Sequence, residues 1–216
     1  MLRHAFFIVL AATFGCCAFA AKPELSVQSI SLLGIQAGGS STLDEVVSKL
    51  GHAERWHSGD ASESEDKLCY RVPHDSGEVT VVFGSSGEMA SPKGQVTSIR
   101  LFGPTVEFPE RARCARTVSK AVRIATANGL SLGMSQVQVK SLFWQKAPSE
   151  NGALEYQFCK QRHIAESDPA FKKWVGRTQC FKDPLRPVVD DCANVQVKFN
   201  NGRASSISLN GVQSIC

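Results

Sequence analysis

The chain has 216 residues, of which 24 are Lys or Arg and 20 are Asp or Glu, giving a formal net charge of +4 at pH 7. This charge is too small and too dispersed to indicate a nucleic-acid partner. Beyond the first twenty residues, no segment approaches the ~20 consecutive apolar residues that a membrane-spanning helix needs.

Residues 1–20 have the pattern of a secretory signal peptide. Arg3 provides a charged start, Ala5–Phe14 is a short apolar run, and Ala18-Phe19-Ala20 places small residues at a cleavage site. We therefore expect cleavage near Ala20 and a periplasmic or secreted mature protein. A lipid anchor on Cys16 stays open as an alternative, and only that anchor would bring the chain to a membrane.

Residues 25–104 are predicted to form a first α+β unit. Thr42 and Glu45 have the spacing of a capping box, and Gly51 can end the helix that follows. Alternation of apolar and polar residues then predicts strands, each with one face on a core. These strands are Lys67–Val72, Val79–Phe83 and Val96–Leu101.

Residues 105–128 are predicted to be a helical linker, with its helix at Glu110–Ala127. Residues 129–216 then repeat the pattern of the first unit, starting with a second capping box at Ser135 and Gln138. The corresponding strands are Leu154–Lys160, Val195–Phe199 and Ala204–Leu209, the last two joined by a hairpin turn at Asn200-Asn201-Gly202.

An insertion, residues 161–191, distinguishes the second unit from the first. Asp168 and Pro169 predict the start of a short helix, Pro169–Val175, which carries Phe171 and Trp174. The repeat as a whole predicts an α+β fold of two tandem units. Each unit is expected to pack a short helical segment on a three- to four-stranded antiparallel sheet.

The segment Gly129–Val139 resembles the start of the helix in the superfamily of β-lactamase-inhibitor proteins and small outer-membrane-assembly lipoproteins. Its Gly133-Met134-Ser135 followed by Val139 carries the resemblance. Tandem copies are more similar to the inhibitor protein than to the single-copy lipoproteins. The resemblance implies a helix-on-sheet fold and a role in binding another protein.

Removal of the signal leaves six cysteines, which in an exported protein indicates disulfide bonds. They are Cys69, Cys114, Cys159, Cys180, Cys192 and Cys216. In the inhibitor family a disulfide joins the first long strand to the segment after the helix, but those segments lack cysteine here. We therefore predict that Cys69 pairs with Cys114 and that the other four pair among themselves.

No set of polar residues has the spacing of a catalytic or metal site, so we expect no enzyme activity, cofactor or metal. His52 and His57 fit surface positions, and Cys159 beside His163 fits a disulfide better than a thiol protease pair. Asp183, Asp190 and Asp191 do not have the spacing of a calcium loop.

A partner protein is therefore the expected ligand. Trp, Tyr and Arg dominate binding hot spots, and the partner-binding candidates are Trp174, Phe171, Trp56, Arg71 and Arg100. The outward face of the strands is expected to be polar, mildly basic and without aromatic residues. An inhibitor of a secreted or periplasmic enzyme is one form of this function, and an envelope-assembly or scaffold component is a second. A small-molecule or enzymatic site in the groove between the two units is the alternative of a different class.

Overall fold

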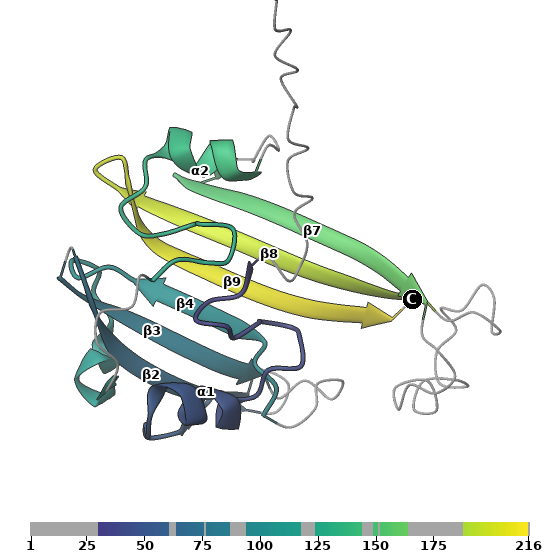
Figure 1. The fold of residues 1–216 in the computed structure, drawn as a ribbon, viewed down its shortest axis with the longest axis horizontal. Coiled ribbons are helices and arrows are strands. Elements are labelled where there is room, and N and C mark those ends of the chain that lie inside the picture. Colours follow the sequence, from purple (N-terminus) through teal and green to yellow (C-terminus); the bar gives the residue numbers. More distant parts are fainter. Residues whose placement is uncertain are drawn as a thin grey trace, which may run out of the picture.

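The computed structural model describes residues 30–60, 64–75, 77–86, 94–117, 124–143, 149–150, 152–163 and 188–215. Two short helices lie on one face of a single sheet (Figure 1). These two helices are α1 (Leu43–Leu50) and α2 (Gln136–Phe143), and a separate 3-10 helix, η3 (Pro109–Arg113), lies in the linker. The strands are β1 (Trp56–Ser58), β2 (Glu65–His74), β3 (Gly77–Ser86), β4 (Ser98–Phe102), β5 (Ala115–Arg116), β6 (Ser149–Glu150), β7 (Ala153–His163), β8 (Val188–Asn200) and β9 (Arg203–Ile215).

The predicted fold class, two tandem units each with its own helix-covered sheet, is wrong. The strand order is β1-β2-β3-β4-β9-β8-β7-β6, with the short β5 pairing with β2. The chain therefore forms one mainly antiparallel sheet with two short helices. Separate units would each have left a strand edge of unpaired backbone groups, on β4 and on β9. Antiparallel pairing of β4 with β9 satisfies both edges at once.

The pairing of β4 with β9 is centred on Arg100 and Ser208, which lie directly opposite each other. On either side, Ile99 pairs with Leu209 and Leu101 pairs with Ile207. These four side chains are buried and point to the helix-covered face, because neighbouring residues of a strand alternate between faces. Arg100 and Ser208 consequently lie on the opposite face.

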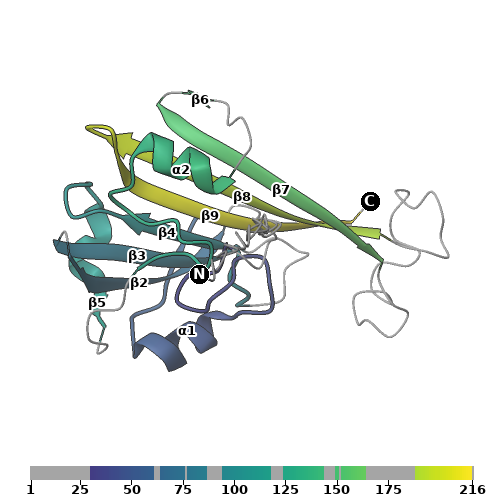
Figure 2. The same ribbon diagram turned by 45° about the horizontal axis from the view of Figure 1, so that its top comes forward.

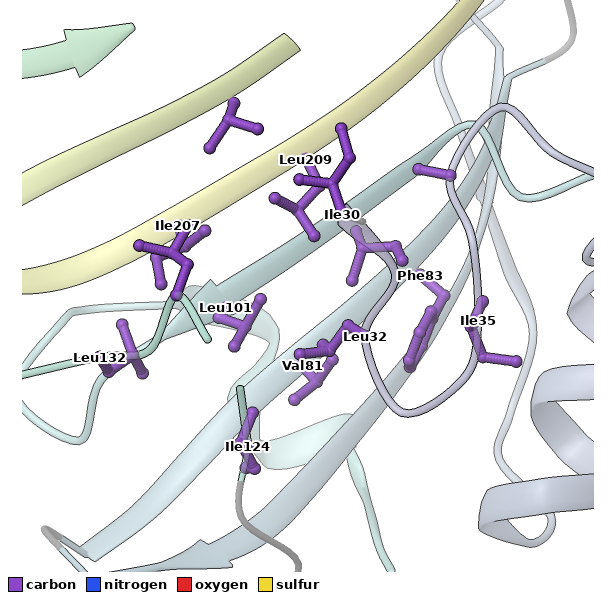
Figure 3. Close-up of a cluster of buried hydrophobic side chains, with 14 of the residues drawn as sticks. Ile30, Leu32, Ile35, Val81, Phe83, Leu101, Ile124, Leu132, Ile207 and Leu209 are labelled. Carbon is purple, nitrogen blue, oxygen red and sulfur yellow. The ribbon is translucent and has the colours of Figure 1, made fainter. Parts of the chain in front are cut away.

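One hydrophobic core joins both halves of the chain on the helix-covered face. In the segment before α1, Ile30 lies near Leu209 of β9, Leu32 lies beside Val81 and Leu101, and Ile35 lies on the side of Phe83 (Figure 3). The helices and the linker add further buried side chains, namely Leu43, Val46, Leu50, Ile124, Leu130, Leu132, Val139 and Phe143. Because β4 and β9 share this core, neither half is a separate domain.

Both predicted capping boxes are present. The Glu45 backbone N–H donates to Thr42 Oγ1 at 3.2 Å at the start of α1. At α2, the Gln138 N–H donates to Ser135 Oγ at 3.3 Å and the Ser135 N–H donates to Gln138 Oε1 at 2.8 Å. The predicted starts of α1 and α2 are therefore confirmed.

The predicted hairpin between β8 and β9 is also confirmed. Asn201 and Gly202 form its two-residue turn with φ of 50° and 71°. Positive φ at both central residues is the backbone of a type I′ turn, which matches the twist of the flanking strands.

The predicted helix Glu110–Ala127 is wrong over the residues that the structure describes. The chain instead forms η3 and then β5, and Ala125 and Thr126 make isolated β-bridges. Long-range contacts outweigh helix propensity here. Cys114 is bonded to Cys69, and β5 pairs in parallel with Tyr70 and Arg71 of β2.

Some predicted features lie outside the described residues. These are the signal peptide and the Pro169–Val175 helix with Phe171 and Trp174. The insertion is shorter than predicted at both ends, because β7 continues to His163 and β8 begins at Val188. Among the described residues, no helix has the length and apolar character needed to cross a membrane.

The segment before α1 contacts β9 backbone to backbone. Both are hydrogen-bonded to the residues just before β4, which brings them together. Gly38 N–H donates to the Val96 carbonyl at 2.8 Å, and Gly211 N–H donates to the Thr97 carbonyl at 2.9 Å. A Cβ atom added to Gly211 would overlap the Ala37 carbonyl and the Gly38 Cα. This contact therefore requires glycine at position 211.

We predict that Gly211→Ala destabilises the fold by about 1–3 kcal/mol, because two backbone segments must separate to admit the methyl group. Thermal unfolding followed by circular dichroism measures the effect. Ser208→Ala, on the same strand and the opposite face, is the matched control and should leave the melting temperature nearly unchanged. Equal melting temperatures for Gly211→Ala and wild type would contradict the close contact.

Candidate functional site

The sheet face opposite the helices is called the open face below. In the described part of the chain, α1, α2 and residues 30–37 lie over the other face (Figure 2), and residues 104–117 cross one corner of the open face. Strand register places these side chains on the open face: Lys67, Cys69, Arg71, Val82, Ser98, Arg100, Phe102, Glu155, Gln157, Gln196, Lys198, Ser206 and Ser208.

Two disulfide bonds lie on the open face. Cys69 of β2 is bonded to Cys114 of the linker, with Cα atoms 4.7 Å apart, and this is the pairing that we predicted. Cys159 is bonded to Cys192, directly across from it on β8, with Cα atoms 4.1 Å apart. Disulfides persist in oxidising compartments, so both bonds indicate an extracellular or periplasmic environment.

The prediction that the four cysteines of the second half pair among themselves now leaves Cys180 to pair with Cys216. Both residues lie outside the described part of the chain. Peptide mapping of the unreduced protein by mass spectrometry should find peptides that link Cys180 to Cys216. A free thiol at either position, or a link from either one to Cys69, would contradict this prediction.

Three aromatic side chains form a patch on the open face around the first disulfide. This aromatic patch consists of Trp56, Phe102 and Phe108, packed against Val82 and the Cys69–Cys114 bond. Phe102 and Phe108 stack with ring centroids 5.0 Å apart and planes inclined by 19°. All three side chains are half-buried, so each is held in place while part of it faces solvent.

The expectation that aromatic residues are missing from this face is wrong. Phe102 continues the alternation of Ser98 and Arg100 by one step beyond the predicted end of the strand, so the sequence did carry that signal. Trp56 reaches the face because β1 pairs with β2, placing it opposite Lys67. Phe108 reaches it because the Cys69–Cys114 bond holds the linker on the sheet, which no local pattern predicts.

A charged cluster lies beside the aromatic patch and consists of Glu65, Lys67, Ser98 and Arg100. Arg100 Nη2 lies 2.6 Å from each carboxylate oxygen of Glu65. Ser98 Oγ donates to Glu65 Oε1 at 2.8 Å, and Lys67 Nζ lies 3.2 Å from Glu65 Oε2. Glu65 reaches across β3 at Gly84, where a Cβ atom would overlap its carboxylate.

The Glu65 carboxyl is held in its charged form. Burial by itself would raise its pKa, but the hydrogen bonds and positive charge of Arg100, with help from Ser98 and Lys67, lower the pKa below its usual 4.5. Glu65 is therefore ionised at neutral pH, with two basic side chains, Arg100 and Lys67, as its neighbours. It fixes Arg100 in one place on the open face.

The structure places two of the five predicted partner-binding residues in this site. Trp56 belongs to the aromatic patch and Arg100 to the charged cluster. Arg71 instead supports the linker, because its Nε donates to the Cys114 carbonyl at 3.2 Å and its guanidinium lies 3.6 Å from Glu78. Trp174 and Phe171 lie outside the described residues.

The other half of the open face is polar. Directly across the sheet from Arg100, a row of side chains runs through Ser208, Gln196 and Glu155, and Gln196 donates to the Glu155 carboxylate. Because β4 pairs directly with β9, the two halves meet as neighbouring strands. The small-molecule or enzymatic site that we kept as an alternative presupposed two separate units with a groove between them, whereas the described strands form one sheet.

The remaining chemical candidates do not converge. Cys159 is bonded to Cys192, so no thiol is available there to act with His163. Asp190 and Asp191 are neighbours on β8 and therefore point to opposite faces, while Asp183 lies outside the described residues. Within the described ranges, no group of three metal-ligating side chains occurs.

Comparisons with known proteins give no match to a family model, to a curated protein or to a solved structure. The resemblance to the inhibitor and lipoprotein superfamily therefore stays a prediction. Function has to be argued from the geometry of the open face.

We predict that Glu65→Gln makes the protein less sensitive to acid. A carboxyl whose pKa is lower in the folded chain adds stability above the unfolded pKa, and this contribution disappears as the pH falls through the folded pKa. For Glu65 the loss therefore occurs on acidification from about pH 4.5, the usual carboxyl value. Urea unfolding at pH 7 and pH 3 should show a smaller drop in stability for Glu65→Gln than for wild type.

Glu107→Gln provides the control for this measurement, because Glu107 is an exposed residue of the linker. It should keep the wild-type drop in stability. If Glu65→Gln and wild type lose the same stability between the two pH values, the ionised cluster does not contribute to folding.

Proposed function

We propose that this chain is an exported, non-enzymatic module that binds another protein through the open face. The observation that carries the proposal is the position of the aromatic patch directly beside Arg100. Phe102 and Arg100 are two residues apart on β4, so their side chains emerge next to each other on one face. Large aromatic side chains and arginine dominate the free energy of protein–protein binding.

The rigidity of this region supports a binding role. The patch is held by the Cys69–Cys114 bond, by four sheet strands (β1 to β4) and by stacking of Phe102 on Phe108. Arg100 is fixed by its contacts with Glu65, while about a third of its side chain stays exposed. Side chains that are already ordered lose little conformational entropy on binding, so more of the contact energy appears as affinity.

An inhibitor of a secreted or periplasmic enzyme is the form of this function that we favour. It agrees with the oxidising compartment that the disulfides indicate and with the implied family. An envelope-assembly or scaffold component is the second form, and lipidation of Cys16 would favour it. Intact-mass analysis of the mature N-terminus distinguishes a lipidated Cys16 from cleavage near Ala20.

Site-specific photo-crosslinking tests which face binds. A photoreactive residue at Ser208, beside Arg100 on the open face, should crosslink a protein in the periplasmic or secreted fraction. The same residue at Val137, which is 76% exposed on α2 across the sheet, should give no such product. Products from Val137 alone would contradict binding through the open face.

The captured protein then allows a quantitative test. We predict that Phe102→Ala and Arg100→Ala each weaken its binding by about 10- to 100-fold, as expected for truncation of a hot-spot residue. Lys198→Ala is the matched control, since Lys198 is exposed on the same face but lies on β8, two strands from β4 and outside both the aromatic patch and the charged cluster. Equal affinities for all variants would contradict the proposed role of the patch.

If the captured protein is a hydrolase, loss of its activity on binding identifies the inhibitor form.

A further inference from the structure

One long strand edge is left unpaired by the described part of the chain. β7 lies near the margin of the sheet (Figure 1), and its short neighbour β6 pairs only with Ala153 and Leu154. Residues 155–163 pair with β8 on one side, and no described strand pairs with their other side. The opposite margin of the sheet is covered more fully, because both β1 and β5 pair with β2.

The position of the second disulfide shows which backbone groups face outward from this edge. Directly opposed residues of an antiparallel pair lie about 4.5 Å apart when they exchange no hydrogen bonds and about 5.5 Å apart when they do. Cys159 and Cys192 have Cα atoms 4.1 Å apart, so they form a pair without hydrogen bonds. The N–H and C=O of Cys159 therefore point away from β8, as do those of Glu155, Gln157, Gln161 and His163.

We propose that this edge pairs with the same edge of a second copy, in antiparallel orientation about Cys159. In that register Glu155 of one copy lies opposite His163 of the other, and Gln157 lies opposite Gln161. On the helix side of the sheet, Phe158 of one copy lies opposite Lys160 of the other. Each residue of one copy lies opposite the residue that is equally far from Cys159, in the other direction, on the second copy. Residues whose backbone groups point outward therefore meet one another, and their N–H and C=O groups can pair.

Charge complementarity favours this occupant. The acidic end of the edge at Glu155 meets the imidazole of His163, and the ammonium of Lys160 meets an aromatic ring, a cation–π arrangement. Parallel pairing in register would instead place Lys160 against Lys160. Lys residues on exposed edges discourage indiscriminate strand pairing, and the antiparallel register is the one that provides this lysine with a favourable neighbour.

Pairing of this kind extends the open face. Directly opposed residues of paired strands point to the same side, so the two-fold axis stands perpendicular to the sheet. The open faces of both copies then form one surface. This inference does not depend on the proposed binding function, because it rests on the edge of the sheet and not on the aromatic patch.

Analytical ultracentrifugation of the mature protein with its disulfides intact provides the first test. Wild type should sediment as a dimer at tens of micromolar, and Gln161→Pro should weaken dimerisation by at least tenfold. Proline at position 161 removes an outward N–H and no β7–β8 hydrogen bond, so the monomer should stay folded. Gln161→Ala keeps that N–H and should dimerise like wild type. A monomeric wild type, or a Gln161→Pro dimer as tight as wild type, would overturn the proposal.

Cysteine crosslinking tests the register and does not depend on whether the proline variant folds. Gln157→Cys and Gln161→Cys chains, mixed in equal amounts and oxidised, should form a covalent heterodimer, because these positions lie opposite each other. Either variant alone should crosslink poorly, since its two cysteines would be four residues, or about 13 Å, apart along the strands, beyond disulfide reach. Equal crosslinking of the mixture and of each variant alone would refute the antiparallel register.

Discussion

The antiparallel pairing of β4 with β9 is the interaction on which the rest of the structure depends. It closes the inner edges of the two strand sets and brings Leu101 and Ile207 into one core. It also sets the order of side chains across the open face, where Arg100 lies against Ser208. Without this pairing, each half would have an exposed strand edge and a smaller hydrophobic core. Small domains bury a smaller fraction of their surface and are less stable for that reason.

The first disulfide has a comparable role for the candidate site. It holds residues 104–117 against the sheet, which brings Phe108 onto Phe102 and encloses Val82. Arg111 stabilises the same segment by donating to the carbonyls of Gly103, Pro104 and Val106, each at 2.9 Å. The linker thus becomes part of the site, and the site is assembled from residues distant in sequence.

Local features of the fold were predictable because their causes are local. A capping box requires two side chains three residues apart, and a type I′ turn requires residues such as Asn201 and Gly202 that tolerate positive φ. Strand alternation was equally visible, and Arg100 and Trp56 could be nominated from residue type. The linker helix failed because Cys114 and β5 are fixed by contacts with β2, which outweigh local propensity.

The sequence by itself determined the central parts of six strands (β2, β3, β4, β7, β8 and β9), the starts of α1 and α2, the β8–β9 hairpin and which side chains of these strands share a face. Period-two alternation and capping act within a few residues, so their signals are local. Only the tertiary structure decided that the strands join into one sheet. The alternation of apolar and polar residues shows which face of a strand is buried, but it does not show which strand will pair with its edge, as β4 does with β9. The tertiary structure also decided that Trp56, Phe102 and Phe108 gather beside Arg100. That gathering depends on a disulfide and on strand pairing between segments dozens of residues apart, and such contacts leave no periodic signal in the chain.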